Sequence, residues 1–203
     1  MKQLAPKVKF DEKNKAYYIT TSQFRVSFPK LAKAEAMEEG QDKKFSVAML
    51  FPKKHDRKYL IDACNHLIKL QWGNKPPANL KKPFKDGDSL SYDGYAGMMA
   101  CNGTSKEEYP IRLISQTKQE LQPRDMYAGC WARASITLKA YDMKVNKGVA
   151  IYVQGLQKIA DDEPFGNVRD VADDFESDDI ESPADADNEE NYGDSSPEPE
   201  EEW

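Results

Sequence analysis

Hydrophobic and polar residues alternate along several stretches of this chain, which is the pattern of β-strands that bury one face. Two further segments are weaker candidates because glycine and polar residues interrupt them. The strong strand predictions cover residues 17–28, 45–51, 129–141 and 148–154, and the weaker ones cover residues 95–101 and 111–115.

The segment 129–141 alternates most clearly. One face carries small apolar residues from Ala132 to Ala140, and we predict that this face packs into the core. The opposite face interleaves aromatic and basic side chains with two hydroxyl groups, which indicates a surface that contacts a ligand. Its aromatic and basic residues are Trp131, Arg133, Lys139 and Tyr141.

One long helix is predicted between the strands. After Asp56, a candidate N-cap, apolar residues recur with the period of a helix, and Gly73 is placed to end it. A shorter charged helix is predicted over residues 31–39. Five or six strands with one main inserted helix predict a mostly β fold, a small and largely antiparallel barrel.

The formal net charge of −6 conceals two parts of opposite sign. Residues 1–160 hold 28 Lys and Arg against 16 Asp and Glu, whereas residues 161–203 hold one basic residue against 19 acidic ones. The second part has too few large apolar residues to offset the entropy of ordering a chain. We therefore predict a folded basic domain over residues 1–160 and a disordered acidic tail over residues 161–203.

The apolar runs and the cysteines of the chain indicate the cellular compartment in which the protein works. The chain has no run of 18 or more apolar residues, and residues 1–10 lack the apolar stretch of a secretory signal. Its cysteines, Cys64, Cys101 and Cys130, are odd in number and widely spaced, which favours reduced, buried thiols over a disulfide framework. We expect a cytoplasmic protein that does not bind membranes.

Catalytic and metal-binding chemistry has little support. Cys64 and His66 point in different directions on the predicted helix, so they do not offer the geometry of a zinc site. The chain has two histidines and neither a G-x-S-x-G motif nor a P-loop. Asp86, Asp88 and Asp93 stay as candidate metal ligands of a nuclease, although an Asp-Gly-Asp sequence is more typical of a tight turn. We expect no enzyme activity, no metal and no cofactor.

Single-stranded nucleic acid fits the sequence better, because it requires exposed cations for phosphates and exposed rings on which bases stack. Basic and aromatic residues adjoin at several places in residues 1–160. For any one ring, burial in the core stays open as the alternative. We predict phosphate contacts for Arg25, Lys53, Lys54, Arg133 and Lys139, and base stacking on Trp131, Tyr141, Phe51 and Tyr152.

The acidic tail has two interpretations. A run of acidic residues is most often a solvated extension. A polyanion that ends in an aromatic ring also imitates a single strand, so it can compete for the same basic groove or dock on another protein. On the second interpretation, the partner-binding residues are Glu200, Glu201, Glu202 and Trp203.

Eight short motifs follow one another in order along about residues 20–175: FRVSFP (24–29), FPK (51–53), KDGD (85–88), YAGCWARAS (127–135), KGV (147–149), GLQKI (155–159), DEPFG (162–166) and ADDF (172–175). Together they resemble phage-encoded single-stranded DNA-binding proteins, a family long known only as a domain of unknown function. The resemblance implies an OB-fold core that coats single strands in DNA replication, recombination or repair. It also implies an acidic tail that recruits a polymerase or helicase and competes with DNA.

We therefore expect a phage protein of the host cytoplasm that binds single-stranded DNA with weak sequence preference and contacts replication proteins through its tail. Weaker binding of duplex DNA or RNA stays open, and so does a homodimer. Two alternatives from other classes remain. One is a protein that acts through its tail as a DNA mimic, and the other is a metal-dependent nuclease.

Overall fold

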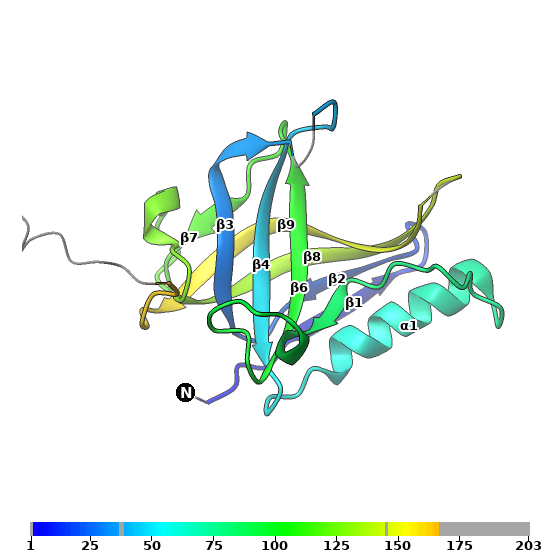
Figure 1. Ribbon diagram of the computed structural model, residues 1–203, viewed down its shortest axis with the longest axis horizontal. Coiled ribbons are helices and arrows are strands. Elements are labelled where there is room, and N and C mark those ends of the chain that lie inside the picture. Colours follow the sequence, from blue (N-terminus) through cyan, green and yellow to red (C-terminus); the bar gives the residue numbers. More distant parts are fainter. Residues whose placement is uncertain (1, 37–38, 145, 167–203) are drawn as a thin grey trace, which may run out of the picture. The chain divides into compact units, whose positions relative to one another are not determined.

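Nine strands, one α-helix and two short 3-10 helices form the part of the chain that the computed structural model describes, namely residues 2–36, 39–144 and 146–166 (Figure 1). The strands are β1 (Lys7–Asp11), β2 (Ala16–Thr20), β3 (Phe24–Glu35), β4 (Lys44–Pro52), β5 (Phe84–Asp86), β6 (Met98–Lys106), β7 (Arg112–Ile114), β8 (Trp131–Asp142) and β9 (Lys147–Ala160). The helices are α1 (Lys58–Trp72), η1 (Gly87–Ser89) and η2 (Pro123–Asp125).

Five of the strands close into a barrel. The pairs β3–β4, β4–β6, β3–β8 and β8–β9 are antiparallel, and the parallel pair β6–β9 completes the ring. Beyond the ring, β2 pairs with β8 and β1 with β2, while β7 pairs with β9 and β5 with β6. A five-stranded ring of this kind is OB-like. The predicted mostly β barrel with one main inserted helix is confirmed.

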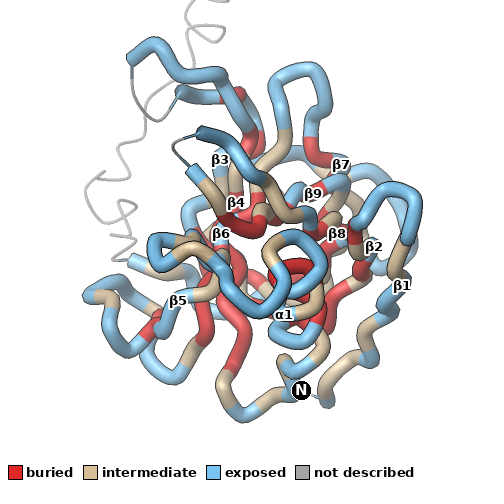
Figure 2. Tube along the Cα trace, turned by 90° about the vertical axis from the view of Figure 1, so that its right-hand side faces the viewer, coloured by how far each residue is buried: buried red, intermediate tan, exposed pale blue. Residues whose placement is uncertain are grey.

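Alternation along β8 sorts its side chains as predicted. Ala132, Ala134, Ile136 and Leu138 are buried in the core, and the residues between them are partly or fully exposed. Figure 2 shows that the buried positions gather inside the barrel and on the side of α1 that packs against it. The opposite face of β8 is therefore free to contact a ligand.

The helix α1 contributes a buried stripe at helical spacing, formed by Leu60, Ala63, Cys64, Leu67 and Ile68. Its N-cap is Arg57 rather than the predicted Asp56, whose carboxylate instead accepts a hydrogen bond from the Lys58 N–H at 2.8 Å. Gly73 ends the helix at a positive φ of 64°, as its position in the sequence predicts.

The three cysteines are free and buried, as the sequence predicts. Burial raises the pKa of Cys64 to about 11 and that of Cys130 to about 11, and it also raises the pKa of Cys101. These thiols are part of the packing. Among the described residues, no helix is long and apolar enough to cross a membrane.

Two predicted elements differ from the structure. The charged helix predicted over residues 31–39 is wrong, because Leu31 to Glu35 belong to β3 and pair with β4 up to Glu35 opposite Lys44. The buried spacing of Leu31 and Ala34 fits one helical turn, but irregular register in this hairpin produces the same spacing in a strand. Tertiary pairing overrides the local pattern here.

The single strand predicted over residues 17–28 is divided into β2 and β3 by a buried polar segment, Thr21 to Gln23. Long-range hydrogen bonds satisfy the polar groups of this segment. The Ser22 N–H donates to the Tyr59 hydroxyl at 3.0 Å, and the Gln23 side chain accepts from the Leu4 N–H at 2.7 Å. β1 and β5 were not predicted, since each is a short strand paired on one side.

Candidate nucleic-acid interface

One surface of the sheet combines exposed tyrosines, cations and hydroxyl groups. We call it the outer face, and it lies on β2, β8 and β9. Register places Thr137 directly opposite Tyr18 on one side and Tyr152 on the other. Both tyrosines are exposed, so their rings are open to a ligand. The outer face comprises Tyr18, Thr20, Arg133, Ser135, Thr137, Lys139, Tyr152, Gln154 and Gln157.

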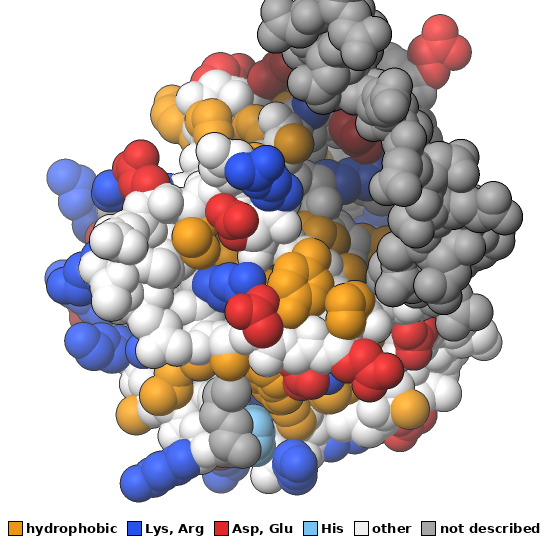
Figure 3. All heavy atoms as spheres, turned by 90° about the vertical axis from the view of Figure 1, so that its left-hand side faces the viewer, with side chains coloured by type: hydrophobic (Ala, Val, Ile, Leu, Met, Phe, Trp, Pro, Cys, Tyr) orange, Lys and Arg blue, Asp and Glu red, His pale blue; other side chains and the backbone are white. Residues whose placement is uncertain are grey.

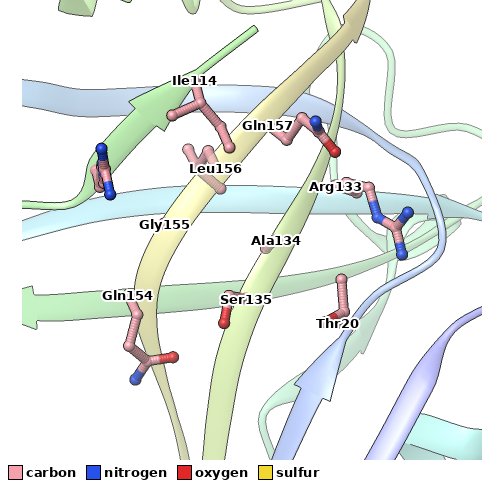
Figure 4. A pocket seen from close by; sticks show the side chains of 10 residues that line it. Thr20, Ile114, Arg133, Ala134, Ser135, Gln154, Gly155, Leu156 and Gln157 are labelled. Carbon is pink, nitrogen blue, oxygen red and sulfur yellow. The ribbon is translucent and has the colours of Figure 1, made fainter. Parts of the chain in front are cut away.

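A hollow of about 300 Å³ opens on this face (Figure 4). Arg133 and Gln157 project from opposing positions of β8 and β9, Thr20 comes from β2, and Arg112 belongs to β7. Ala134, Gly155 and Leu156 supply apolar lining. The hollow thus offers an apolar floor, two guanidinium groups and two amides, a combination that suits a nucleotide.

Arg133 is incompletely satisfied within the described part of the chain. Its Nε is buried without a hydrogen-bond partner, and its Nη2 donates only a long bond of 3.4 Å to the Ala5 carbonyl. A buried donor that lacks a partner is costly. The Nη2 of Arg133 is only weakly engaged by the protein, and Arg133 is accordingly the strongest phosphate-binding candidate on this face.

A register shift in β9 shapes the hollow. Ser135 pairs with Gly155 and Ile136 with Val153, so Gln154 is an extra residue in the ladder. The Gln154 amide donates to Thr137 Oγ1 at 3.0 Å. Bulges of this kind re-aim side chains, and here the bulge brings Gln154 to the lining of the hollow.

Arg25, predicted to contact phosphates, is instead a structural residue. Its side chain is only 14% exposed and lies 3.2 Å from an Asp162 carboxylate oxygen. Its Nη2 donates to the Glu163 carbonyl at 2.6 Å, and its Nε donates to the Gly129 carbonyl. Each of the three guanidinium nitrogens is engaged within the protein, so a DNA phosphate would have to compete with these contacts. The phosphate role is corrected.

Trp131 belongs to the same cluster. The Arg25 guanidinium lies 5.5 Å from the centre of the Trp131 ring and 4.6 Å from that of Phe165, which places it against two aromatic rings. The Trp131 indole N–H donates to Asp162 at 2.6 Å. The Trp131 ring is half-buried, so its predicted stacking on DNA stays a prediction, beside a structural role that the sequence did not indicate.

This cluster holds the segment Asp161–Gly166 on the barrel. We call this segment the latch. The Tyr127 hydroxyl donates to Asp161 at 2.9 Å, the Phe165 N–H donates to the Ala128 carbonyl at 3.0 Å, and the Gly166 N–H donates to Asp93 at 2.7 Å. The disordered tail was predicted to begin at residue 161. The structure moves the end of the folded part to at least Gly166, and residues 167–203, including Glu200–Trp203, lie outside the described residues.

Removing the side chain of Arg25, which holds the latch on the barrel, should destabilise the fold. We expect Arg25→Ala to lower the free energy of unfolding by about 2–4 kcal/mol, because it leaves carbonyl groups and Asp162 without their partner. Urea unfolding followed by tryptophan fluorescence measures this. Arg124→Ala, at an exposed position of η2, is the matched control and should change stability little. Equal stability of the two variants would contradict a latch.

Lys53, also predicted to bind phosphates, is neutralised locally. Its ammonium group lies 2.7 Å from Asp88 and also pairs with Asp86. Hydrogen bonds with Asp86 and Asp88 raise the pKa of Lys53, and the same lysine lowers the pKa of each carboxyl. A phosphate would have to displace both carboxylates. The phosphate contact of Lys53 stays a prediction that requires these two ion pairs to open.

The same carboxylates form the tight turn that the sequence favours. Asp86 caps η1 by accepting the Asp88 N–H at 3.0 Å, and Asp88 accepts the Gly97 N–H at 2.5 Å. Asp93 is engaged with Gly166. Among the described residues, no three His, Cys, Asp or Glu side chains gather where they could hold a metal ion.

The other predicted residues are distributed over the molecule. Phe51 is 1% exposed and packs 5.2 Å from Phe24 between ring centres, so a base has no access to it and its stacking prediction is wrong. Lys54 is exposed in the turn after β4, outside the outer face. Tyr141 is half-buried opposite Gly148, and Lys139 is exposed opposite Ala150. Arg133, Lys139 and Tyr141 are thus spread along one side of β8, and Tyr152 lies on β9 opposite Thr137.

Charge alone does not identify the binding surface. On the face shown in Figure 3, basic, acidic and hydrophobic side chains are interspersed. Tyr18 and Arg112 of the interface were not predicted from the sequence. Alternation beside buried Ile19 could have indicated that Tyr18 is exposed, but its position next to Thr137 depends on pairing between distant segments.

Comparisons with known proteins give a consistent result. The family model described as Enterobacter phage Enc34, ssDNA-binding protein, matches residues 17–187. Protein p50 of Acyrthosiphon pisum secondary endosymbiont phage 1 is 29% identical over 162 residues, which cover 72% of this chain and 85% of p50.

Solved structures show the same fold. The single-stranded DNA-binding protein of bacteriophage Enc34 in complex with ssDNA matches with a TM-score of 0.64 and 24% identity, over 78% of this chain and 97% of that one. Its C-terminally truncated form matches at 0.62 and 25%, over 80% and 99%. Bacteriophage T7 gp2.5, a single-stranded DNA-binding protein, matches at 0.54 and 14%, over 88% and 100%.

Proposed function

Since the chain belongs to the family of the Enterobacter phage Enc34 ssDNA-binding protein, we propose that it binds single-stranded DNA through the outer face and performs no chemistry on it. The observation that carries this proposal is the hollow with the unsatisfied Arg133, flanked by exposed tyrosines. Stacking rings beside cations are what a single strand requires.

Each group on the face has a distinct role in this proposal. Arg133 donates to a phosphate as a planar fork, and Lys139 acts as a point charge. Tyr152 and Tyr18 stack on bases, and Tyr141 extends this surface along β8. Hydroxyl and amide groups such as Thr137 and Gln154 donate to phosphate or sugar oxygens. Sequence preference should be weak, because every base has a π face.

The biological setting follows from this binding. We propose that the protein coats exposed single strands during phage DNA replication, recombination or repair, in the cytoplasm of the host cell. Duplex DNA and RNA helices should bind more weakly because paired bases are not free to stack on tyrosines. Sedimentation of the unchanged chain, with and without oligo-dT, tests the homodimer that the sequence leaves open.

The acidic segment after Gly166 is proposed to compete with DNA and to recruit a polymerase or helicase through Glu200–Trp203. Residues 167–203 carry 16 acidic residues against one basic residue, so they can occupy a cationic surface in place of phosphates. The described chain ends at Gly166, which bonds Asp93 beside the exposed Tyr92. The last described residue therefore lies on the barrel surface.

Charge on the outer face should appear in the salt dependence of binding. We expect Lys139→Gln to weaken oligo-dT binding modestly and to reduce the slope of log K against log salt concentration by about one. Fluorescence anisotropy over a salt series gives this slope. Lys58→Gln, at the exposed start of α1, is the control and should leave the slope unchanged. Identical slopes for both variants would remove Lys139 from the interface.

A further inference from the structure

Two exposed aromatic rings lie side by side outside the interface described above. Phe28 of β3 and Tyr92, in the loop before β6, are each 55% exposed. Their ring centres are 5.3 Å apart with an interplanar angle of 79°. The buried Tyr95 supports them, with its ring centre 5.2 Å from that of Tyr92 and 6.4 Å from that of Phe28. We call Phe28 and Tyr92 the aromatic pair.

The backbone holds Phe28 in an unusual conformation. Its φ is +42°, a value that bulky side chains rarely adopt. It lies where the β3–β4 register shifts between Ser27 and Lys30, so an irregularity of the strand turns the ring outward. Backbone strain that presents an apolar ring to solvent is typical of a ligand-binding position.

A row of polar side chains connects this place to the outer face. Lys30 pairs with Ser46, Ser46 with Thr104, and Thr104 with Tyr152. The neighbours of Ser46 and Thr104, namely Phe45, Val47 and Gly103, are buried, so Ser46 and Thr104 point outward. Three strand intervals separate Lys30 from Tyr152, or roughly 14 Å at ordinary strand spacing.

We propose that the aromatic pair is a second base-stacking site for the same DNA strand, which continues from Tyr152 over Thr104 and Ser46. This inference rests on the proposed function. The occupant is DNA because the row offers what a sugar-phosphate backbone requires between two stacking sites, hydroxyl donors and a cation. Lys30 pairs with Glu35 at 2.6 Å, but both side chains are about half exposed, so this ion pair is weak enough to exchange for a phosphate.

Ring-removal variants test the site. Phe28→Asn removes the ring and tolerates a positive φ, and Tyr92→Ser removes the second ring from a loop. Tyr109→Ser is the control, since Tyr109 is 68% exposed in the turn after β6. We expect the first two variants to bind oligo-dT more weakly by roughly fivefold to a hundredfold each, and the control to bind as the unchanged chain does.

Cross-linking of the unchanged protein provides a test that does not depend on folding of a variant. Oligo-dT containing 5-iodouracil should form photo-adducts on Phe28 or Tyr92, located by mass spectrometry of the digested protein. The inference is wrong if the unchanged chain binds oligo-dT, no photo-adduct forms on Phe28 or Tyr92, and the ring-removal variants keep their affinity. The proposed function stands in that case. Loss of self-association without loss of DNA affinity would assign the pair to a second copy and overturn the inference. If the unchanged chain binds no oligo-dT, the proposed function fails first.

Discussion

Replacing Arg133 by Gln and Tyr152 by Ser in one chain should weaken binding of oligo-dT by roughly 100-fold. The variant removes a charge-assisted hydrogen bond and one base stack, which together contribute about 3 kcal/mol or more. The fold should persist, because Tyr152 is exposed and the Arg133 Nε has no partner among the described residues. Anisotropy titration of labelled oligo-dT measures the affinity, and thermal unfolding confirms the fold.

The matched control combines Arg124→Gln with Tyr109→Ser. It removes the same functional groups from exposed positions of η2 and the turn after β6, outside the outer face. Its affinity should equal that of the unchanged chain. If both double variants lose affinity equally, binding depends on total charge and the outer face is not the interface.

Ending the chain after Gly166 should tighten DNA binding at low salt by roughly tenfold to a hundredfold. The shortened chain loses 16 acidic residues and one basic residue, so competing negative charge disappears while the latch is kept. The gain should shrink as salt rises, because screening weakens the competition. Anisotropy titrations of both chains at low and high salt measure it.

The residue at which the chain is shortened decides whether the fold keeps its stability. A chain that ends after Ala160 also loses Asp162, Glu163 and Phe165, which Arg25 contacts, and should unfold at lower urea concentration than the chain that ends after Gly166. Weaker DNA binding by the chain that ends at Gly166, with its stability intact, would contradict competition by the acidic segment.

Local periodicity made much of the fold predictable. In β8, one side faces the core and the other faces solvent, so alternation in the sequence identifies both the strand and the outer face. In α1, the buried stripe has the helical period. The same pattern placed Arg133 and Lys139 on the face of β8 opposite the core, because side chains two apart in a strand point the same way.

Other features depend on contacts that periodicity does not carry. In β4, Phe51 faces the core, but Leu50 on the opposite face is also buried, beneath a cluster that includes Tyr95 and Phe165. A strand covered on both faces has no alternation, so its aromatic residue was misassigned to the surface. Arg25 was misassigned because its partners Asp162 and Glu163 are more than 130 residues away in the chain.

The most direct test of the central claim is an anisotropy titration of labelled oligo-dT and of a duplex of equal length with the chain that ends after Gly166. The account predicts clear preference for the single strand, with affinity that falls as salt rises but a preference that persists, because stacking on Tyr18 and Tyr152 requires unpaired bases. Equal affinity for the two DNAs at every salt concentration, or no binding of oligo-dT, would contradict it.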